Sequence, residues 1–254
     1  MIKQKKKTSP DYSPFADIYA HSRPRYPSEL FNYLVSLVNR HHLAWDCATG
    51  NGQAALELAR HFDRIIATDI SAEQINNAMQ HPNIEYRVVK SEQSGLEDRS
   101  IDLVTIASAI HWFNLDNFYQ ELQRVVYPGG VVAAFTYHVG YVKPPFDRVF
   151  NRFYHEVLSP YFAPGARLVD NRYETITLPG KSLDSPDFQV SADWNFNQML
   201  AFIRSWSGTQ QYIRERGEDP VDLIREELSQ IWGTPQSIHT LRWPLYLRFA
   251  RLNL

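Results

Sequence analysis

Two acidic residues and a turn of small residues follow apolar stretches at a spacing that suits nucleotide binding. Asp46 ends the first apolar stretch and opens the turn 46–52, which reads Asp-Cys-Ala-Thr-Gly-Asn-Gly. Asp69 ends the next apolar stretch, 64–69. Small residues let a backbone approach a ligand closely, and a carboxylate at a second strand end can accept hydrogen bonds from ribose hydroxyls. The pattern predicts a site for an adenosine-containing cofactor.

A titratable and aromatic segment comes directly after a later apolar stretch. The run 107–113, Ala-Ser-Ala-Ile-His-Trp-Phe, places one imidazole and two large rings past a strand end. A single histidine is often structural, so His111 could serve a site or the core, and Trp112 could simply close the core. Nearer the N-terminus, Tyr19 and Arg23 could meet a carboxylate, because a guanidinium pairs with it through two parallel hydrogen bonds. Arg23 could equally set the start of the first helix.

The elements that must position these residues alternate between strand and helix. Hydrophobic patterns predict strands over 43–47, 64–69, 84–89, 101–107 and 131–137. Helices are predicted over 27–38, 53–61, 71–80 and 114–126, the last ended by Pro128-Gly129-Gly130. Alternation at this pitch implies parallel βαβ units with right-handed crossovers, and ligands at the carboxyl ends of the strands.

The second half of the chain breaks this rhythm. Residues 141–170 are rich in aromatic residues and proline, which predicts short helices between breaks. After them the patterns predict a strand near 188–196, helices over 197–206 and after Pro220, and a strand near 238–249. The change of pattern indicates that a cap interrupts the sheet and that the C-terminal residues complete it.

We therefore expect an α/β protein: a Rossmann-like, doubly wound, mostly parallel sheet of seven strands with an inserted helical cap. Residues 1–26 are expected to form an N-terminal tail and lid segment, and residues 27–137 the cofactor-binding core. Residues 138–186 are expected to form the cap, and residues 187–254 to complete the sheet and the cap.

The composition excludes several classes of protein. The 254 residues carry a formal net charge of −2, so no overall positive field favours nucleic acid as a partner. Cys47 is the only cysteine, and the adjacent His41 and His42 have no further ligands at metal spacing, so neither a disulfide nor a metal is expected. No apolar run is long enough to cross a membrane, and no signal-peptide pattern follows the basic residues 1–7. We expect a cytoplasmic protein.

The order and spacing of these motifs resemble those of class I S-adenosylmethionine-dependent methyltransferases. The resemblance is strongest to the small-molecule branch that includes trans-aconitate methyltransferase. It rests on the turn 46–52, on Asp69, on the run 107–113, and on Tyr19-x-x-x-Arg23-Pro24-x-Tyr26-Pro27. The glycine-rich loop of this family usually reads Asp-x-Gly-x-Gly-x-Gly. Here Ala48 replaces the first glycine, which is tolerable if residue 48 does not need a positive φ.

The resemblance implies S-adenosylmethionine as the cofactor and assigns residues to its parts. Asp46 would lie near the ammonium group, and the loop residues Ala48, Gly50 and Gly52 would pass beneath the methionine part. The remaining cofactor residues would be Asp69 and Ile70 at the ribose, Ser91 and Glu92 at the adenine, and Ala107 beside the methyl-transfer centre. The residues at the methyl acceptor, and hence the catalytic candidates, would be His111, Trp112, Arg23 and Tyr19.

The implied reaction is methyl transfer to a small organic acceptor, most simply to an oxygen of a carboxylate-bearing metabolite. A carboxylate acceptor needs no base, whereas a hydroxyl acceptor needs one near neutral pKa, for which His111 is the candidate. Two other functions remain open: methylation of a macromolecule (tRNA or protein), and a cofactor-binding scaffold without turnover. A nicotinamide enzyme is disfavoured, because Gly50-x-Gly52 is followed by Ala55 where Gly-x-Gly-x-x-Gly requires glycine. The sequence predicts no oligomeric state.

Overall fold

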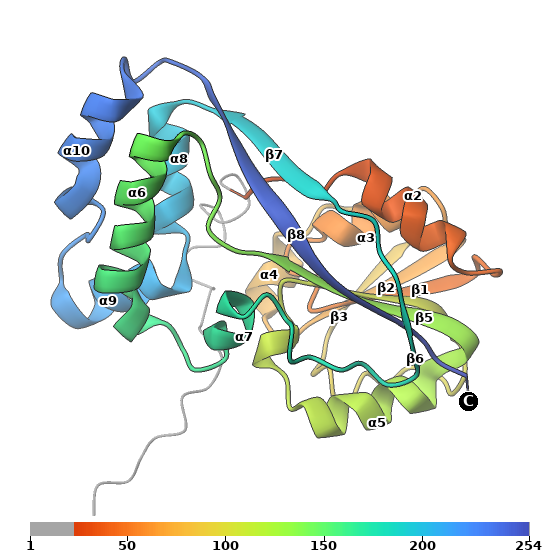
Figure 1. The fold of residues 1–254 in the computed structure, drawn as a ribbon. Coiled ribbons are helices and arrows are strands. Elements are labelled where there is room, and N and C mark those ends of the chain that lie inside the picture. The colour runs from red at the N-terminus through yellow and green to blue at the C-terminus, as the bar shows by residue number, and fades with distance from the viewer. Residues whose placement is uncertain (1–22, 254) are drawn as a thin grey trace, which may run out of the picture.

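The computed structural model describes residues 23–253, where one mixed sheet is flanked by helices (Figure 1). The predicted site residue Tyr19 lies outside the described residues. The strands are β1 (Leu43–Cys47), β2 (Arg64–Asp69), β3 (Ile84–Val88), β4 (Ile101–Ala107), β5 (Val126–Tyr137), β6 (Lys181–Leu183), β7 (Gln189–Trp194) and β8 (His239–Arg251).

Within this range the strand order confirms the Rossmann-like, doubly wound, mostly parallel fold. The order is β3-β2-β1-β4-β5-β8-β6, and β7 pairs with β8 off this path, which gives eight strands. All of them except β6 correspond to the seven predicted strands. Strands β1 to β5 run parallel, whereas β8 is antiparallel to β5, β6 and β7. The strand order reverses between β1 and β4, and ligands bind at such a switch point.

Helices cover both faces of the parallel strands. They are α2 (Ser28–Ser36), α3 (Gln53–Leu58), α4 (Ala72–Asn76) and α5 (Leu115–Val125). α2 and α3 lie on one face of the sheet and α5 on the other (Figure 1). α2 and α3 bury their apolar residues in one core with Leu103, and α5 buries Phe118 in a second core with Val104. Successive residues of β4 thus face two different cores, because side chains alternate along a strand.

Four helices gather beyond one end of the sheet, and we call them the cap helices (Figure 1). They are α6 (Pro144–Arg152), α8 (Phe196–Arg204), α9 (Ser207–Arg216) and α10 (Asp222–Trp232). The short elements η3 (Phe153–Leu158), η4 (Ser159–Tyr161) and α7 (Ala166–Asp170) follow α6. Aromatic rings hold the cap helices together, as in the pair Phe146 and Trp232 with centroids 5.6 Å apart.

The division of the chain at residue 186 does not coincide with the division between cap and sheet. The segment 138–186 supplies α6 and α7, but it also holds β6, which pairs with β8 in the sheet. The segment 187–254 supplies α8, α9 and α10, which lie beside α6. The cap is therefore built from two separate stretches of the chain.

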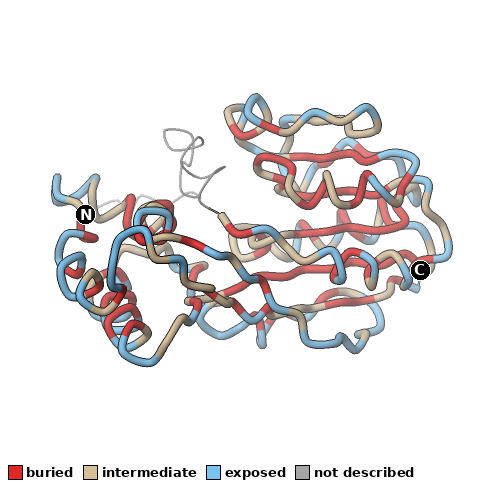
Figure 2. Tube along the Cα trace, turned by 90° about the horizontal axis from the view of Figure 1, so that it is seen from above, coloured by how far each residue is buried: buried red, intermediate tan, exposed pale blue. Residues whose placement is uncertain are grey.

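Strand β8 runs from the cap helices into the sheet without a break (Figure 1). Residues 239–244 pair with β7, and residues 245–251 pair with β5. Trp243, near the junction, is buried with its ring centroid 5.3 Å from those of Trp194 and Phe202. Figure 2 shows buried residues both along the central strands and among the cap helices. Cap and sheet thus share one continuous strand.

Candidate functional site

A cleft of about 390 Å³ lies at the carboxyl ends of β1, β2 and β3. Five of the predicted cofactor residues line it: Ala48, Asp69, Ile70, Ser91 and Glu92. They come from three loops that are separate in sequence, and the parallel strands bring them to one edge. The rings of Trp112 and Phe113, from the loop after β4, also line this cleft.

The Asp69 carboxylate is anchored by backbone groups and still faces the cleft. Its Oδ2 accepts a hydrogen bond from the Gly50 amide at 2.9 Å, and its Oδ1 accepts one from the Ser71 amide at 2.8 Å. Burial raises the pKa of Asp69 above its usual value, whereas these backbone hydrogen bonds lower it. A carboxylate can accept about four hydrogen bonds, so Asp69 retains acceptor capacity for ribose hydroxyls.

Two neighbours shape the cleft around Asp69. The apolar side chain of Ile70 is 61% exposed and lines the cleft, where it offers a flat surface to an aromatic base. Glu92 accepts a hydrogen bond from the Asn114 amide at 2.9 Å, which fixes the loop after β3 to the start of α5. The cleft therefore combines a carboxylate with apolar and aromatic walls.

Asp46 lies beneath the loop and lines neither the cleft nor the cavities described below. It is completely buried, and its carboxylate accepts hydrogen bonds from the Thr49 hydroxyl, the Thr105 hydroxyl (2.7 Å) and the Ala55 amide (3.0 Å). Burial raises the pKa of Asp46 to about 6. This geometry makes Asp46 a brace for the loop, in contrast to the predicted position at the ammonium group.

The loop backbone favours glycine at three positions: 50 and 52, where glycine is present, and 48, where the chain has alanine. Gly50 has a φ of 56°, and Gly52 has a φ of 89° and lies so close to the Tyr86 hydroxyl that a Cβ would overlap it. Ala48 has a φ of 55°. Alanine was expected to be tolerable here only if residue 48 did not need a positive φ, and the structure shows that it does. A non-glycine residue in this region is strained by about 1–2 kcal/mol.

Ala48→Gly is expected to raise the free energy of unfolding by roughly 1 kcal/mol, because glycine adopts this backbone without the Cβ clash. Chemical denaturation measures the change. In the matched control Ala72→Gly, at an exposed position of helix α4, the free energy of unfolding is expected to fall by roughly 0.5–1 kcal/mol. If the free energy of unfolding fell equally in Ala48→Gly and Ala72→Gly, the backbone of Ala48 would not be strained.

A smaller cavity of about 60 Å³ lies on the other side of the loop. Gly50 and Ala107 line it, and Ala48 lines both this loop cavity and the cleft. Arg23 and Tyr137 line the loop cavity and also a further pocket of about 110 Å³ against the cap helices, which we call the cap pocket. The cavities therefore form a path from Asp69 at one end to the cap at the other.

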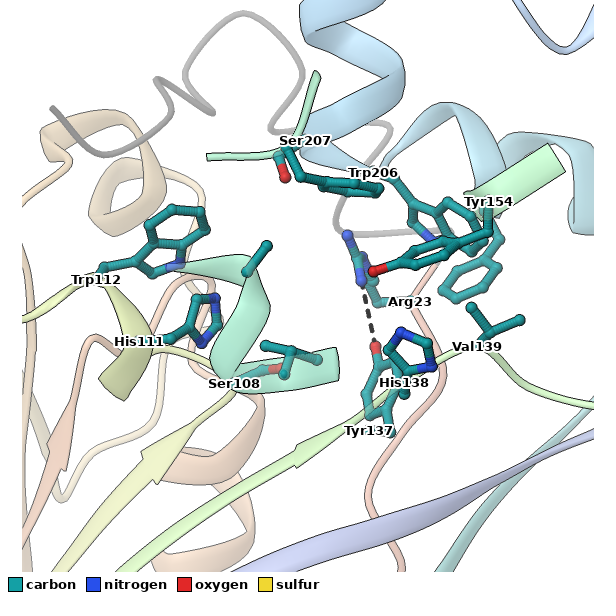
Figure 3. Close-up of a pocket in the computed structure, with 14 residues that line it drawn as sticks. Arg23, Ser108, His111, Trp112, Tyr137, His138, Val139, Tyr154, Trp206 and Ser207 are labelled. Atoms are coloured by element: carbon teal, nitrogen blue, oxygen red, sulfur yellow. Dashed lines mark hydrogen bonds between the residues drawn. The ribbon is translucent and has the colours of Figure 1, made fainter. Parts of the chain in front are cut away.

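The cap pocket combines aromatic walls with nitrogen-bearing side chains (Figure 3). Trp112, Tyr154 and Trp206 are among its walls, and His111 is its predicted titratable residue. Within residues 23–253, no aspartate or glutamate lines it. The cap pocket thus brings together the predicted residues Arg23, His111 and Trp112.

Arg23 is held on the wall of the cap pocket by contacts from two elements. Its Nη2 donates to the Ser205 carbonyl at 3.1 Å, and its Nη1 donates to the Tyr137 hydroxyl at 3.4 Å (Figure 3). The guanidinium carbon also lies 5.4 Å from the centroid of the Phe202 ring. Because an arginine stays charged at any physiological pH, the pocket always contains one fixed positive charge.

His111 belongs to a chain of hydrogen bonds that keeps it neutral. Its Nδ1 lies 2.7 Å from the buried Tyr173 hydroxyl, and the Ser108 and Thr136 hydroxyls are 2.7 Å apart. Burial raises the pKa of Tyr173 and outweighs a hydrogen bond with Thr136 that lowers it, so the Tyr173 phenol beside His111 is neutral. Burial also lowers the pKa of His111 to about 3, which makes it a weak base near neutrality.

Several residues of the cap pocket were missed by the sequence analysis. Tyr137 is the last residue of β5 and His138 follows it directly, and this position at a strand end could have identified them. Tyr173, by contrast, is 62 residues from His111 and carries no local signal. Asp170, the partner of His138, is equally remote in sequence.

The cavities fit S-adenosylmethionine as judged by their chemistry. Asp69 can accept from ribose hydroxyls, Ile70 can cover an adenine face, and the loop cavity at Gly50 can take the methionine part. The path then leads past Ala107 to the cap pocket, where an acceptor would meet the methyl group. In the described part of the chain, no group of three or more metal-ligating side chains is present, and no helix is long and apolar enough to cross a membrane.

Comparisons with known proteins show similarity to methyltransferases. Residues 45–134 match a family model described as a methyltransferase domain. The chain is 30% identical, over 92% of its length and 91% of the other protein, to a Dictyostelium discoideum protein named as a methyltransferase. It is 25% identical, over 84% of its length and 86% of the other, to a Saccharomyces cerevisiae protein named as an S-adenosylmethionine-dependent methyltransferase.

A solved structure extends the likeness to the cap. It is described as a type II methyltransferase from Anaeromyxobacter dehalogenans, with 37% identity, a TM-score of 0.84, and coverage of 91% of this chain and 99% of that one. The likeness therefore spans the cap as well as the sheet. The chain belongs to the class I S-adenosylmethionine-dependent methyltransferases.

Proposed function

We propose that the enzyme methylates an oxygen atom of a small, carboxylate-bearing metabolite. The observation that carries this proposal is Arg23, a permanent cation that lines the cap pocket beside its aromatic walls. A guanidinium pairs with a carboxylate through two parallel hydrogen bonds. The choice of a small-molecule acceptor follows the resemblance to the branch that includes trans-aconitate methyltransferase.

The chain's own residues would bind and orient the acceptor. When bound, S-adenosylmethionine supplies an electrophilic methyl group, so the protein mainly has to position a nucleophilic oxygen and exclude water. Arg23 would hold the acceptor carboxylate, and Trp112, Tyr154 and Trp206 would surround its carbon skeleton. Neutral His111, with Nδ1 occupied by Tyr173, would offer its Nε2 hydrogen to an acceptor oxygen.

The test begins with an unbiased acceptor pool. A metabolite extract is passed over an anion exchanger, and carboxylic acids are released near pH 2, where they lose their charge. The proposal expects that this fraction accepts label from methyl-labelled S-adenosylmethionine above a control without enzyme. Label confined to tRNA or protein added in parallel, with none in the acid fraction, would overturn it.

Arg23→Gln is expected to raise the KM for that acid fraction about tenfold, because the charge-assisted hydrogen bonds to the carboxylate are lost. The affinity for the cofactor, measured by calorimetry, should change far less. Arg25→Gln is the matched control, since Arg25 is exposed and does not line the cap pocket. An unchanged KM in Arg23→Gln would contradict the assigned role.

A further inference from the structure

His138 forms a hydrogen-bonded pair with an aspartate at the edge of the cap pocket. Its Nε2 lies 2.9 Å from Oδ1 of Asp170, and the Tyr154 hydroxyl donates to the same oxygen at 2.7 Å. The rings of His138 and Tyr154 pack edge to face, with centroids 4.8 Å apart. Figure 3 shows His138 and Tyr154 near Arg23, across the pocket from His111 and Trp112.

The pairing fixes which nitrogen of His138 carries the hydrogen. Burial raises the pKa of Asp170, but hydrogen bonds from His138 and Tyr154 outweigh it and bring the pKa below its usual value. An ionised carboxylate only accepts hydrogen bonds, so Nε2 of His138 must donate. The lone pair of Nδ1 is then available to take a proton.

The two histidines of the cap pocket differ in the group to which each is hydrogen-bonded. His111 is hydrogen-bonded to the phenol of Tyr173, and burial lowers its pKa to about 3. His138 is bonded to a carboxylate that is itself held by a second donor. The residue suited to accept a proton is His138, which the sequence analysis did not select, and not His111, which it did.

We propose that His138, oriented by Asp170, is the general base for the hydroxyl group of a hydroxy acid whose carboxylate pairs with Arg23. This inference rests on the proposed function and specifies its substrate class. The hydroxyl oxygen forms the new bond to the methyl carbon as the carbon–sulfur bond breaks, and that bond's electron pair stays on sulfur. The hydroxyl proton moves to Nδ1 of His138 and later leaves to solvent, while Asp170 remains ionised.

The charged and titratable groups around His138 come from every element that packs against it. Asp170 belongs to α7, Tyr154 and His155 to η3, Tyr137 to β5, and Arg23 to the segment before α2. Of these, His155 is exposed and does not line the cap pocket, although its ring centroid is 6.4 Å from that of His138. It therefore provides a matched control for a change of charge near His138.

His138→Gln is expected to lower kcat at least 100-fold, because a general base typically contributes a factor of about 10²–10⁴. The KM for the acid fraction and the calorimetric affinity for S-adenosylmethionine should stay within about twofold, which also shows that the variant folds. Asp170→Asn should also lower kcat, because an amide in place of the carboxylate no longer fixes the hydrogen of His138 on Nε2. His155→Gln should leave kcat unchanged. A wild-type kcat in His138→Gln would overturn the inference.

A second test uses the methylated product of the wild-type enzyme and therefore does not depend on whether a variant folds. Mild alkali hydrolyses a carboxylic methyl ester to methanol and leaves a methyl ether intact. Label that resists alkali, on a product that still binds an anion exchanger, is the expected result. Alkali-labile label would overturn the inference about His138 while leaving the proposed function standing. No label in any acid would overturn the proposed function itself.

Discussion

Asp46→Ala is expected to lower the free energy of unfolding by about 3–5 kcal/mol. The reason is that the Asp46 carboxylate accepts hydrogen bonds from Thr49, Thr105 and the Ala55 amide in a completely buried position. Removal of the acceptor leaves these donors without partners, and each buried unsatisfied polar group costs roughly 1–3 kcal/mol. The loop over Asp46 and the start of α3 would lose their common anchor.

Denaturant titration measures this loss, and a surface acid provides the control. Asp98 is 73% exposed and pairs with Arg124 at 2.6 Å, so Asp98→Ala should lower the free energy of unfolding by less than about 1 kcal/mol. Asp46→Asn keeps one acceptor oxygen, so its loss in free energy of unfolding should lie between those of Asp46→Ala and Asp98→Ala. A loss below about 1 kcal/mol in Asp46→Ala would show that the carboxylate is not a brace.

Asp69→Ala is expected to weaken S-adenosylmethionine binding roughly 100-fold, which corresponds to ~3 kcal/mol. The variant loses the carboxylate that would accept from the ribose hydroxyls. It also loses the bonds that hold the Gly50 and Ser71 amides at 2.9 and 2.8 Å, so the loop of the cleft is less ordered. Both effects lower the affinity for the cofactor without touching the cap pocket.

Calorimetric titration with S-adenosylmethionine and S-adenosylhomocysteine measures the change. His111→Gln is the matched comparison, because His111 lines the cap pocket and not the cleft, and its cofactor affinity should stay within about twofold. Denaturation of both variants checks that each one folds. If the two variants lost affinity to the same extent, the separation of cofactor cleft and acceptor pocket would be wrong.

The parallel core could be predicted because its strands are covered on both faces. The strands over 43–47, 64–69 and 101–107 have the predicted bounds, since strands buried on two sides read as unbroken apolar runs. Helix α9 was missed because its buried residues are glycine, threonine and glutamine, which give no apolar periodicity. Strand β6 was missed because three largely exposed residues acquire their conformation only by pairing with β8.

The gathering of Ala48, Asp69 and Ser91 in one cleft was predictable for the same reason, since each of these residues lies at or after a strand end that the sequence marks. The left-handed backbone conformation of Ala48 could not be predicted, because an alanine in the sequence does not indicate a positive φ. The pair of His138 and Asp170 joins residues 32 positions apart, one directly after β5 and the other at the end of α7. Only the path of the chain through the cap brings them together, and no local pattern encodes that path.

The continuity of β8 determines how the cap can move and how it can be exchanged. A hinge needs a few residues that absorb large changes in φ and ψ, but β8 crosses between cap and sheet as a hydrogen-bonded strand. The segment between β5 and α6 is fastened to it by two backbone hydrogen bonds between Tyr141 and Arg242, at 2.9 and 3.0 Å. A rotation of the whole cap against the sheet would have to break these hydrogen bonds. To replace the cap with that of a relative, β7 and β8 would have to be transferred with the cap helices, because β8 is the strand that orients these helices on the sheet.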